Sequence, residues 1–221
     1  MVKPQKTGSL AVMTPDLDAL AARIKATQSD DCRILVAIAG APASGKSTLS
    51  DRLCHHLGGD EAGAAVVPMD GFHFDDAILK QRDLLNRKGA PNTFDVGGLQ
   101  RILAALKTDT DQDVYVPLFD RGLELSRGSA RCISPRHKII LVEGNYLLLG
   151  QAPWDRLAPM FDLSIYLDVA EEILRARLID RWRGFGFDDA SALEKALGND
   201  LPNAQIVATM TGPSDIRVTA G

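Results

Sequence analysis

Runs of consecutive apolar residues alternate along the chain with stretches in which apolar residues recur every three or four positions. The continuous runs are typical of strands buried in a parallel sheet, and the periodic stretches are typical of helices that cover it. The predicted strands are 33–39, 64–69, 138–142 and 162–167, followed by a short last strand at 215–219. After a first helix that begins at Thr14 and Pro15, the predicted helices are 48–57, 75–87, 96–107, 170–183, 188–197 and 201–210.

Strands that alternate with helices predict an α/β fold with three layers and a mainly parallel five-stranded sheet. Two helix starts carry capping signals: Thr14 followed by Pro15, and Asp95 before the helix 96–107. Three segments are less regular. Residues 1–13 are expected to be loosely ordered, 123–133 is either a hairpin or an excursion from the sheet, and 153–160 is a short helix or a turn.

Length and composition limit the classes of protein to consider. A chain of 221 residues fits a single domain, 1–221, that can bury a full core. The formal net charge of -4 provides no basic field to attract nucleic acid. No apolar run reaches the ~18 residues of a membrane span, and no signal-like apolar segment opens the sequence. Cys32, Cys54 and Cys132 form no close pair, so we expect a cytoplasmic protein without disulfides or a zinc site.

The residues between the first predicted strand and the helix that follows it read G-A-P-A-S-G-K-S. The pattern G-x-x-x-x-G-K-S in this context is the phosphate-binding loop of P-loop proteins. Its glycines let the backbone wrap closely around a phosphate, and the amides at the helix start point toward the anion. Lys46 is expected to bind the β- and γ-phosphates, and the Ser47 hydroxyl to ligate Mg²⁺. The expected nucleotide-binding residues of this loop are Gly40, Ala43, Ser44, Gly45, Lys46, Ser47 and Thr48.

Two acidic residues end predicted strands near this loop. Glu143 follows the run 138–142, where a carboxylate can hold Mg²⁺ directly or through water. Asp70 follows the run 64–69, and ligands of open α/β sheets bind outside the carboxyl ends of the strands. A carboxylate there can accept the proton of an attacking hydroxyl, so Asp70 is the candidate general base. The alternatives are an ordinary strand-end acid for Glu143, and a metal-water ligand or helix cap for Asp70.

The predicted helix 170–183 carries four arginines before the sequence Gly-Phe-Gly-Phe at 184–187. Residues 170–187 therefore predict a helical lid whose guanidinium groups neutralise charge on the γ-phosphate and exclude water. Arg177 and Arg181 lie one turn apart on the same helix face, and they are the candidates for this contact. A solvated basic helix face is the alternative.

Candidate acceptor-binding residues lie beside the two carboxylates. His73 follows Asp70 by three residues, and a solvated loop position is its alternative. Arg121 follows the extended segment 114–119 and can bind an anionic or polyhydroxyl compound. Aromatic residues that can form the walls of a sugar or base site are Phe72, Phe94 and Tyr146.

Five short motifs follow one another along the chain. They are the P-loop at 40–47, M-D-G-F-H at 69–73, K-G-A-P-N-T-F-D at 88–95, F-D-R at 119–121 and V-E-G-N-Y at 142–146. In this order they resemble the phosphoribulokinase, uridine kinase and bacterial pantothenate kinase family, over about residues 34–210. The sequences D-G-F-H and N-D-L-P-N-A, the latter at 199–204, resemble its branch named fructose-transport-system kinase or fructokinase.

The resemblance implies a kinase that uses ATP with Mg²⁺. It implies that Asp70 is the base, that Glu143 is the Walker-B acid, that the helix 170–183 is the lid and that Asn203 lies near the adenine. The sequence F-D-R at 119–121 differs from the Y-D-F or Y-D-H of uridine kinases and from the Y-S-H of pantothenate kinases. Neither uridine nor pantothenate is therefore the first expectation for the acceptor.

We expect an ATP-dependent kinase that transfers the γ-phosphate to a hydroxyl of a small polar metabolite. A fructose-like sugar is favoured as acceptor, followed by a nucleoside and a pantothenate-like alcohol. One alternative is a nucleotide-driven switch or chaperone that acts on a protein partner, although the guanine-reading motif N-K-x-D is absent. A regulator with degraded catalysis is another. The expected partners are ATP and the small acceptor, without nucleic acid or membrane, and a homodimer stays an open alternative.

Overall fold

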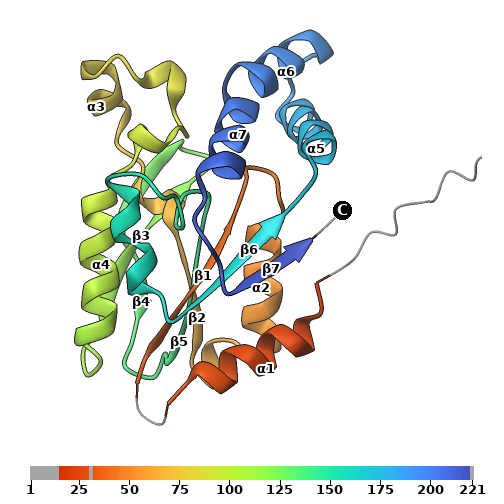
Figure 1. Cartoon of the computed structure of the whole chain (residues 1–221). Helices are drawn as coiled ribbons and strands as arrows, with labels where there is room; N and C mark the ends of the chain where they lie inside the picture. The colour runs from red at the N-terminus through yellow and green to blue at the C-terminus, as the bar shows by residue number, and fades with distance from the viewer. Residues whose placement is uncertain (1–14, 30–31, 220–221) are drawn as a thin grey trace, which may run out of the picture.

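Five parallel strands form the central sheet of the protein (Figure 1). The computed structural model describes residues 15–29 and 32–219, so the expectations for 1–13 and for a cap at Thr14 lie outside the described residues. The strand order is β2–β5–β1–β6–β7, and each neighbouring pair is parallel. The strands are β1 (Ile34–Gly40), β2 (Ala64–Pro68), β5 (Ile139–Gly144), β6 (Leu163–Asp168) and β7 (Ile216–Thr219). The prediction of an α/β fold with a mainly parallel five-stranded sheet is confirmed.

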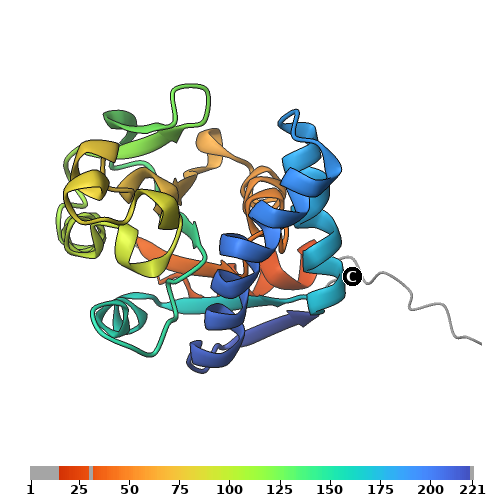
Figure 2. The same ribbon diagram turned by 90° about the horizontal axis from the view of Figure 1, so that it is seen from above.

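The two faces of the sheet pack against two layers of helices (Figures 1 and 2). In β1 the odd-numbered side chains from Leu35 to Ala39 pack in the cluster that includes α4 (Val96–Thr108) and α7 (Leu201–Met210). The even-numbered side chains from Ile34 to Ile38 pack with α1 (Leu17–Thr27) and α2 (Lys46–His56). Every residue of β1 is buried. This explains why its sequence is a continuous apolar run rather than an alternating one.

Helices stand on both sides above the carboxyl ends of the strands (Figure 1). On one side are α5 (Glu171–Gly184), α6 (Asp189–Lys195) and a π-helical turn, Ala196–Asp200, that leads into α7. Leu178, Ala196 and Leu201 pack together there as a small separate cluster. On the other side is α3 (Asp76–Gln81). Among the described residues, none of the helices has the length and apolar character that crossing a membrane requires.

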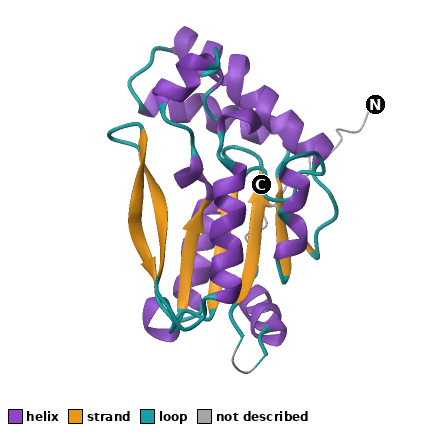
Figure 3. Ribbon diagram, turned by 90° about the vertical axis from the view of Figure 1, so that its left-hand side faces the viewer, coloured by secondary structure: helices purple, strands orange, loops and turns teal. Residues whose placement is uncertain are grey.

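A two-stranded antiparallel ribbon lies apart from the main sheet, at the left of Figure 3. It consists of β3 (Val114–Asp120) and β4 (Leu125–Ile133). The guanidinium of Arg131 in β4 donates a hydrogen bond to the carbonyl of Val66 in β2. Because β4 pairs with β3, the segment 123–133 is part of a hairpin. The turn of this hairpin lies near α3, since Lys88 contacts both Glu124 and Asp76.

One helix is much shorter than predicted. The helix expected over 75–87 ends at Gln81, because Asp83 adopts a left-handed backbone conformation with φ of 55° that an α-helix cannot include. The N-cap of α1 is Asp16, whose carboxylate accepts a hydrogen bond from the Ala19 amide. The part of the chain that the structure describes also contains short 3₁₀ turns at Asp60–Ala62, Met69–Phe72, Leu85–Arg87, Pro91–Thr93, Trp154–Arg156 and Ala158–Met160.

Candidate active site

The loop between β1 and α2 has the geometry of a phosphate cradle. Ala43 and Gly45 both have positive φ, 62° and 93°, and Gly45 is the N-cap of α2 without a side chain to cap it. The first amides of α2 are thus open to an anion, which the helix dipole also attracts. A Cβ on Gly40 would lie 2.8 Å from Ser44 Oγ and 3.1 Å from the Leu167 carbonyl. Only glycine fits at Gly40, where the loop packs against β6.

Ser47 and Glu143 meet at the start of α2. The Ser47 hydroxyl donates a hydrogen bond to Glu143 Oε2 over 3.2 Å, and Glu143 is only 7% exposed at the end of β5. Burial raises the pKa of Glu143, and the nearby Lys46 ammonium acts in the opposite direction. A buried carboxylate of this kind gains most from a cation close to it.

These two oxygens fit a magnesium ion better than a metal that prefers nitrogen or sulfur. Mg²⁺ prefers oxygen ligands, and in kinases it is held by one or two protein groups together with phosphates and water. The part of the chain that the structure describes contains no group of three or more His, Cys, Asp or Glu side chains arranged to hold a metal alone. Ser47 and Glu143 therefore suit an ion that arrives with a nucleotide.

Asp70 lies in the 3₁₀ turn Met69–Phe72, directly after β2, at the carboxyl edge of the sheet. Its carboxylate accepts a hydrogen bond from Arg121 Nη2 over 2.9 Å. The Asp70 side chain is 26% exposed and the Arg121 side chain 55%. Asp70 thus faces an open space rather than the core, and its ion-pair partner Arg121 comes from the β3–β4 turn.

A single cavity of about 1170 Å³ joins the loop, Asp70 and the helices above the sheet. Its size exceeds the ~300–1,000 Å³ of ordinary small-molecule sites, as expected where two ligands bind side by side. Predicted site residues that line it are Ala43, Gly45, Lys46, Ser47, Thr48, Asp70, His73, Phe94, Arg121, Arg181 and Asn203. Sequence positions far apart in the chain are thus brought to one place.

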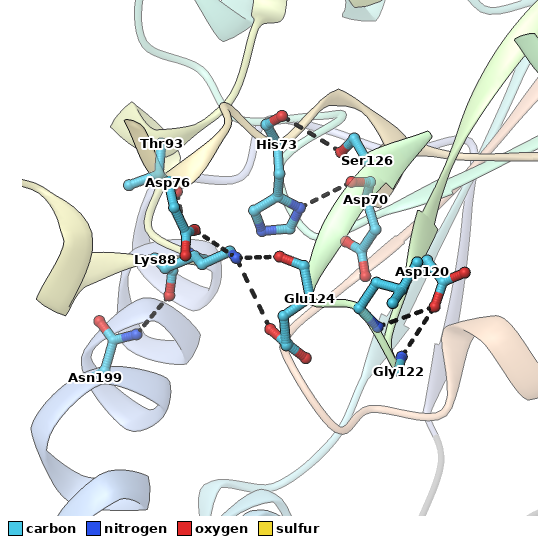
Figure 4. A network of polar contacts seen from close by, with 12 residues as sticks. Asp70, His73, Asp76, Lys88, Thr93, Asp120, Gly122, Glu124, Ser126 and Asn199 are labelled. Carbon is cyan, nitrogen blue, oxygen red and sulfur yellow. Dashed lines mark hydrogen bonds and ion pairs between the residues drawn. The ribbon is translucent and has the colours of Figure 1, made fainter. Parts of the chain in front are cut away.

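His73 lies between two aromatic rings on the wall next to Asp70. Its ring centre is 4.0 Å from that of Phe94 and 4.8 Å from that of Phe119. His73 Nδ1 is 2.8 Å from the carbonyl oxygen of Asp70, as Figure 4 shows. Burial lowers the pKa of His73, and the Asp70 carboxylate raises it to a smaller extent. Burial thus favours the neutral form of the imidazole, and its ring and hydrogen-bond contacts fix its orientation.

Phe72 and Tyr146 do not line the cavity, in contrast to their expected role as walls for the acceptor. Phe72 is 6% exposed and Tyr146 0%, and both belong to the main hydrophobic core. The Tyr146 hydroxyl donates a hydrogen bond to the Gly89 carbonyl over 2.7 Å. Their aromatic surface is used in packing beneath the site, and the half-buried Phe119 lines the cavity instead.

The two candidate lid arginines of α5 have different surroundings. Arg181 lines the cavity, with its guanidinium carbon 5.8 Å from the Phe185 ring centre. Arg177 Nη1 lies 3.4 Å from the Ala43 carbonyl and 3.3 Å from the Ser44 carbonyl. Arg181 therefore faces the cavity, whereas Arg177, one helical turn earlier, contacts backbone carbonyls of the phosphate loop.

Four buried side-chain atoms in the described residues have no hydrogen-bond partner, and all belong to this region. They are Ser44 Oγ, Asn145 Oδ1, Asn199 Oδ1 and Asn203 Oδ1. Unsatisfied buried polar atoms are rare and costly, and they commonly mark places where a ligand or water is bound. Asn203 is 1% exposed in the first turns of α7.

Sequence reasoning missed several residues that line the cavity: Lys88, Phe119, Glu124, Asn145, Trp182, Asn199 and Asp200. Burial raises the pKa of Asp200, which accepts a 2.6 Å hydrogen bond from Trp182 Nε1. Lys88 and Asn145 lie within the motifs K-G-A-P-N-T-F-D and V-E-G-N-Y, and this position was the only available signal. Phe119 lies in the motif F-D-R, and Asn199 and Asp200 lie in N-D-L-P-N-A. Glu124 and Trp182 lie in segments whose pattern indicates only a turn or a helix.

The sequence model of the phosphoribulokinase/uridine kinase family matches residues 35–191, which is most of the chain. This chain belongs to the phosphoribulokinase/uridine kinase family. The match includes the phosphate loop, Asp70, Glu143 and Arg181, so most of the site described above lies in the part shared with the family. Asn203 lies beyond the matched range.

Relatives of this family member carry different names. A crystal structure of a "putative fructose transport system kinase" from Silicibacter sp. TM1040 is 41% identical, with a TM-score of 0.87, and covers 93% of this chain and 100% of that chain. The Schizosaccharomyces pombe "Putative uridine kinase C227.14" is 33% identical over 184 residues, 79% of this chain and 78% of the relative. Myxococcus xanthus pantothenate kinase is 34% identical over 156 residues, 67% of this chain and 49% of the relative.

Family membership makes this protein a P-loop kinase. Such kinases use ATP with Mg²⁺ and differ in the compound that receives the phosphoryl group. The three relatives are named for different acceptors. The geometry of the acceptor side therefore has to distinguish among these classes.

Proposed function

We propose that the protein transfers the γ-phosphate of ATP to a hydroxyl of a small, uncharged polyhydroxyl compound, with a fructose-like sugar as first choice. The observation that carries this proposal is that Asp70 lines the same cavity as Lys46 and Ser47 of the phosphate loop. A hydroxyl bound beside Asp70 faces a nucleotide held by the loop. Phosphoryl transfer depends mainly on such positioning and on neutralisation of charge.

Each side chain has a defined task in this proposal. Asp70 accepts the proton of the attacking hydroxyl, and Lys46 neutralises the β- and γ-phosphates. Ser47 and Glu143 hold Mg²⁺, which, when bound, offsets the negative charge of the phosphates. Arg181 brings positive charge from α5 into the cavity. Arg177 supports the loop from behind through its contacts with the Ala43 and Ser44 carbonyls.

Paired charges on the acceptor side favour an uncharged compound. Arg121 is bound to Asp70 over 2.9 Å, and Lys88 is bound to Asp76 over 2.8 Å. Both cations on this side thus already face a carboxylate. An acceptor with a carboxylate or a phosphate would meet cations whose charge a carboxylate already offsets, and its own charge would lie beside that of Asp70. Hydroxyl groups can instead donate to Asp70 and accept from Arg121 while both pairs persist.

The rings of His73 and Phe119, tilted by 47° to each other, add a partly apolar surface to this side of the cavity. Such a surface suits the less polar face of a sugar ring, and it suits a nucleoside as second choice. The fructose name of the Silicibacter relative supports the same order. We place the protein in the cytoplasm, because Cys32, Cys54 and Cys132 are free thiols and such thiols persist in reducing compartments.

The experiment that tests this proposal measures ADP formation with Mg·ATP and a panel of fructose, other sugars, a phosphorylated sugar, uridine and pantothenate. Phosphorus NMR of the products then identifies a new sugar phosphate. We expect fructose or a related sugar to stimulate ADP formation, and a Lys46→Met variant to abolish it. Lys46→Met is the blank because it removes the loop cation and leaves the acceptor side unchanged.

Stimulation by pantothenate or a phosphorylated sugar, but by no uncharged compound, would refute the argument from paired charges. ADP formation that no hydroxyl compound stimulates, together with nucleotide-dependent binding of a protein, would favour the switch or chaperone alternative. The two results concern different parts of the proposal and can be told apart.

A further inference from the structure

Lys88 connects the acceptor side of the cavity to the lid side, and nothing in the proposed reaction uses it. Its side chain is 19% exposed. The ammonium lies 2.8 Å from Asp76 Oδ1, 2.6 Å from the Glu124 carbonyl oxygen and 3.8 Å from Glu124 Oε2. It also lies 5.3 Å from the Phe119 ring centre. Figure 4 shows Lys88 between Asp76 and Glu124, at the point where α3 meets the β3–β4 turn.

The contact with Glu124 holds an unfavourable backbone conformation. Glu124 has a φ of 54°, in the left-handed region that residues other than glycine rarely adopt. Its carbonyl and its carboxylate both face Lys88. Glu124 and Phe119 line the acceptor side of the cavity. The position of this wall therefore depends on the Lys88 ammonium.

The backbone of Lys88 faces in the other direction, toward the π-helical turn Ala196–Asp200. The Lys88 carbonyl accepts a hydrogen bond from Asn199 Nδ2 over 2.9 Å, and Arg87 Nη1 donates to the Gly198 carbonyl over 3.2 Å. Because Nδ2 of Asn199 must face this carbonyl, the buried Oδ1 is left in its unpartnered position. The Lys88 carbonyl thus holds this turn, while the Asn199 Oδ1 atom stays without a hydrogen-bond partner.

Hydrogen bonds restrain the backbone of the segment 87–93 around Lys88. Gly89 has a φ of 95°, its amide donates to Thr93 Oγ1 over 3.0 Å, and its carbonyl accepts from Tyr146. Thr93 Oγ1 in turn donates to the Ala90 carbonyl over 2.7 Å. Thr93 is fully buried, and the tyrosine that binds Gly89 belongs to the main core. A shift of the ammonium is therefore passed to the Lys88 carbonyl rather than absorbed by the loop.

We infer that Lys88 is a positioning residue that couples occupation of the acceptor side to the position of the lid turn 196–200. The ammonium holds the Glu124 wall, the carbonyl holds Asn199, and neither end transfers a proton or a phosphoryl group. An acceptor that displaces Phe119 or Glu124 would move Asn199 through Lys88. This inference rests on the proposed function for the existence of an acceptor, but the connection itself is a property of the protein alone.

The two tryptophans of the chain report on two regions next to Lys88, the lid turn 196–200 and the segment 87–93. Trp182 Nε1 donates to Asp200, next to Asn199, and Trp154 Nε1 donates to the Pro91 carbonyl over 3.2 Å. The full chain labelled with 5-fluorotryptophan gives one fluorine resonance for each, assigned by a Trp182→Phe variant. Lys88→Met is the test variant. Lys80→Met, an exposed change on α3, is its matched control.

We expect Lys88→Met to shift or broaden the Trp182 resonance, although no bond joins the two side chains, and Lys80→Met to leave it unchanged. If Lys88→Met does not unfold cooperatively, Asp76→Asn replaces it, with Asp75→Asn as control. Asp76→Asn is then expected to move the Trp182 resonance in the same manner. An unmoved Trp182 resonance in a folded test variant would overturn the inference, whatever the acceptor proves to be.

Binding and kinetics separate positioning from direct contact with the nucleotide. Titration calorimetry with the Mg²⁺ complex of a non-hydrolysable ATP analogue is expected to give the same Kd for Lys88→Met as for wild type. With a compound phosphorylated in the panel assay, we expect the acceptor KM to rise about tenfold, the factor that one charge-assisted hydrogen bond supplies. A tenfold rise in the nucleotide Kd would show that Lys88 binds phosphate and would overturn the positioning role.

Discussion

Replacement of Asp70 by asparagine removes a proton acceptor and changes little else. Asparagine has the same shape, and its amide oxygen can still accept a hydrogen bond from Arg121, which lies 2.9 Å from the Asp70 carboxylate. It cannot take a proton from a hydroxyl. General-base catalysis contributes about 10²–10⁴ in rate, so we expect kcat to fall by about that factor.

The stability cost of Asp70→Asn should be small. The ion pair with Arg121 is weakened, but the two side chains are 26% and 55% exposed, so solvent screens their attraction. A pair of this kind contributes at most about 1 kcal/mol. In a domain of this size, that corresponds to a Tm shift of about 2–4 °C. A fall of several hundredfold in kcat therefore cannot be explained by partial unfolding.

Nucleotide binding should be unchanged or slightly tighter in Asp70→Asn. The Asp70 charge contributes to the raised pKa of Glu143, which indicates that the two carboxylates repel each other. Without Asp70, the site is less negative, and an anionic nucleotide meets less repulsion. A loss of binding would place Asp70 among the metal ligands instead.

The assay follows ADP release with the best acceptor of the panel, and calorimetry with a non-hydrolysable ATP analogue gives the nucleotide Kd. Asp75→Asn is the matched control, because it removes one charge five positions away. Asparagine can replace Asp75 as N-cap of α3, where the carboxylate accepts from the Ala77 amide. Near-normal kcat in Asp70→Asn would refute the assignment of the base and the reasoning from the shared cavity.

Two further predictions concern stability. Gly89→Ala should lower the free energy of unfolding by about 1–2 kcal/mol, because Gly89 has a φ of 95° that alanine adopts only with strain. A Cβ at Gly89 would meet no atom within 4 Å, so no steric clash contributes. Gly128→Ala has equal space and no positive φ, and it should be near neutral in the same denaturant titration. Folding lowers the pKa of His73, so protonation of its imidazole favours the unfolded chain. His73 therefore contributes stability at neutral pH, and this contribution is lost as the pH falls below the ordinary imidazole pKa. Denaturant midpoints at about pH 7.5 and about pH 5.5 should therefore differ more in wild type than in His73→Gln, and an equal pH dependence in both would contradict this cause.

The sequence indicated the sheet well because parallel strands need apolar side chains on both faces. The runs that became β1, β2, β5 and β6 are visible as continuous apolar segments for this reason. The extent of α3 was not visible, because a left-handed residue such as Asp83 depends on local packing that periodicity does not encode. The prediction that Phe72 and Tyr146 form walls of the acceptor site was wrong for a similar reason. Tyr146 and Asn145 are adjacent at the end of β5, and only the packed structure decides which of them faces the core.

By itself, the sequence determined which chemistry is available. A phosphate loop works through glycine dihedrals, helix amides and two fixed side chains, and all of these are local, so G-A-P-A-S-G-K-S specifies them without a fold. Tertiary structure alone decided which distant residues share the cavity. The packing of helices and turns above the sheet decides that Arg181 lines the cavity while Arg177 contacts the phosphate loop. It also decides that Phe119 lines the cavity instead of Phe72, and that Lys88 contacts Asn199. Packing is a property of the whole chain, and no short pattern records it.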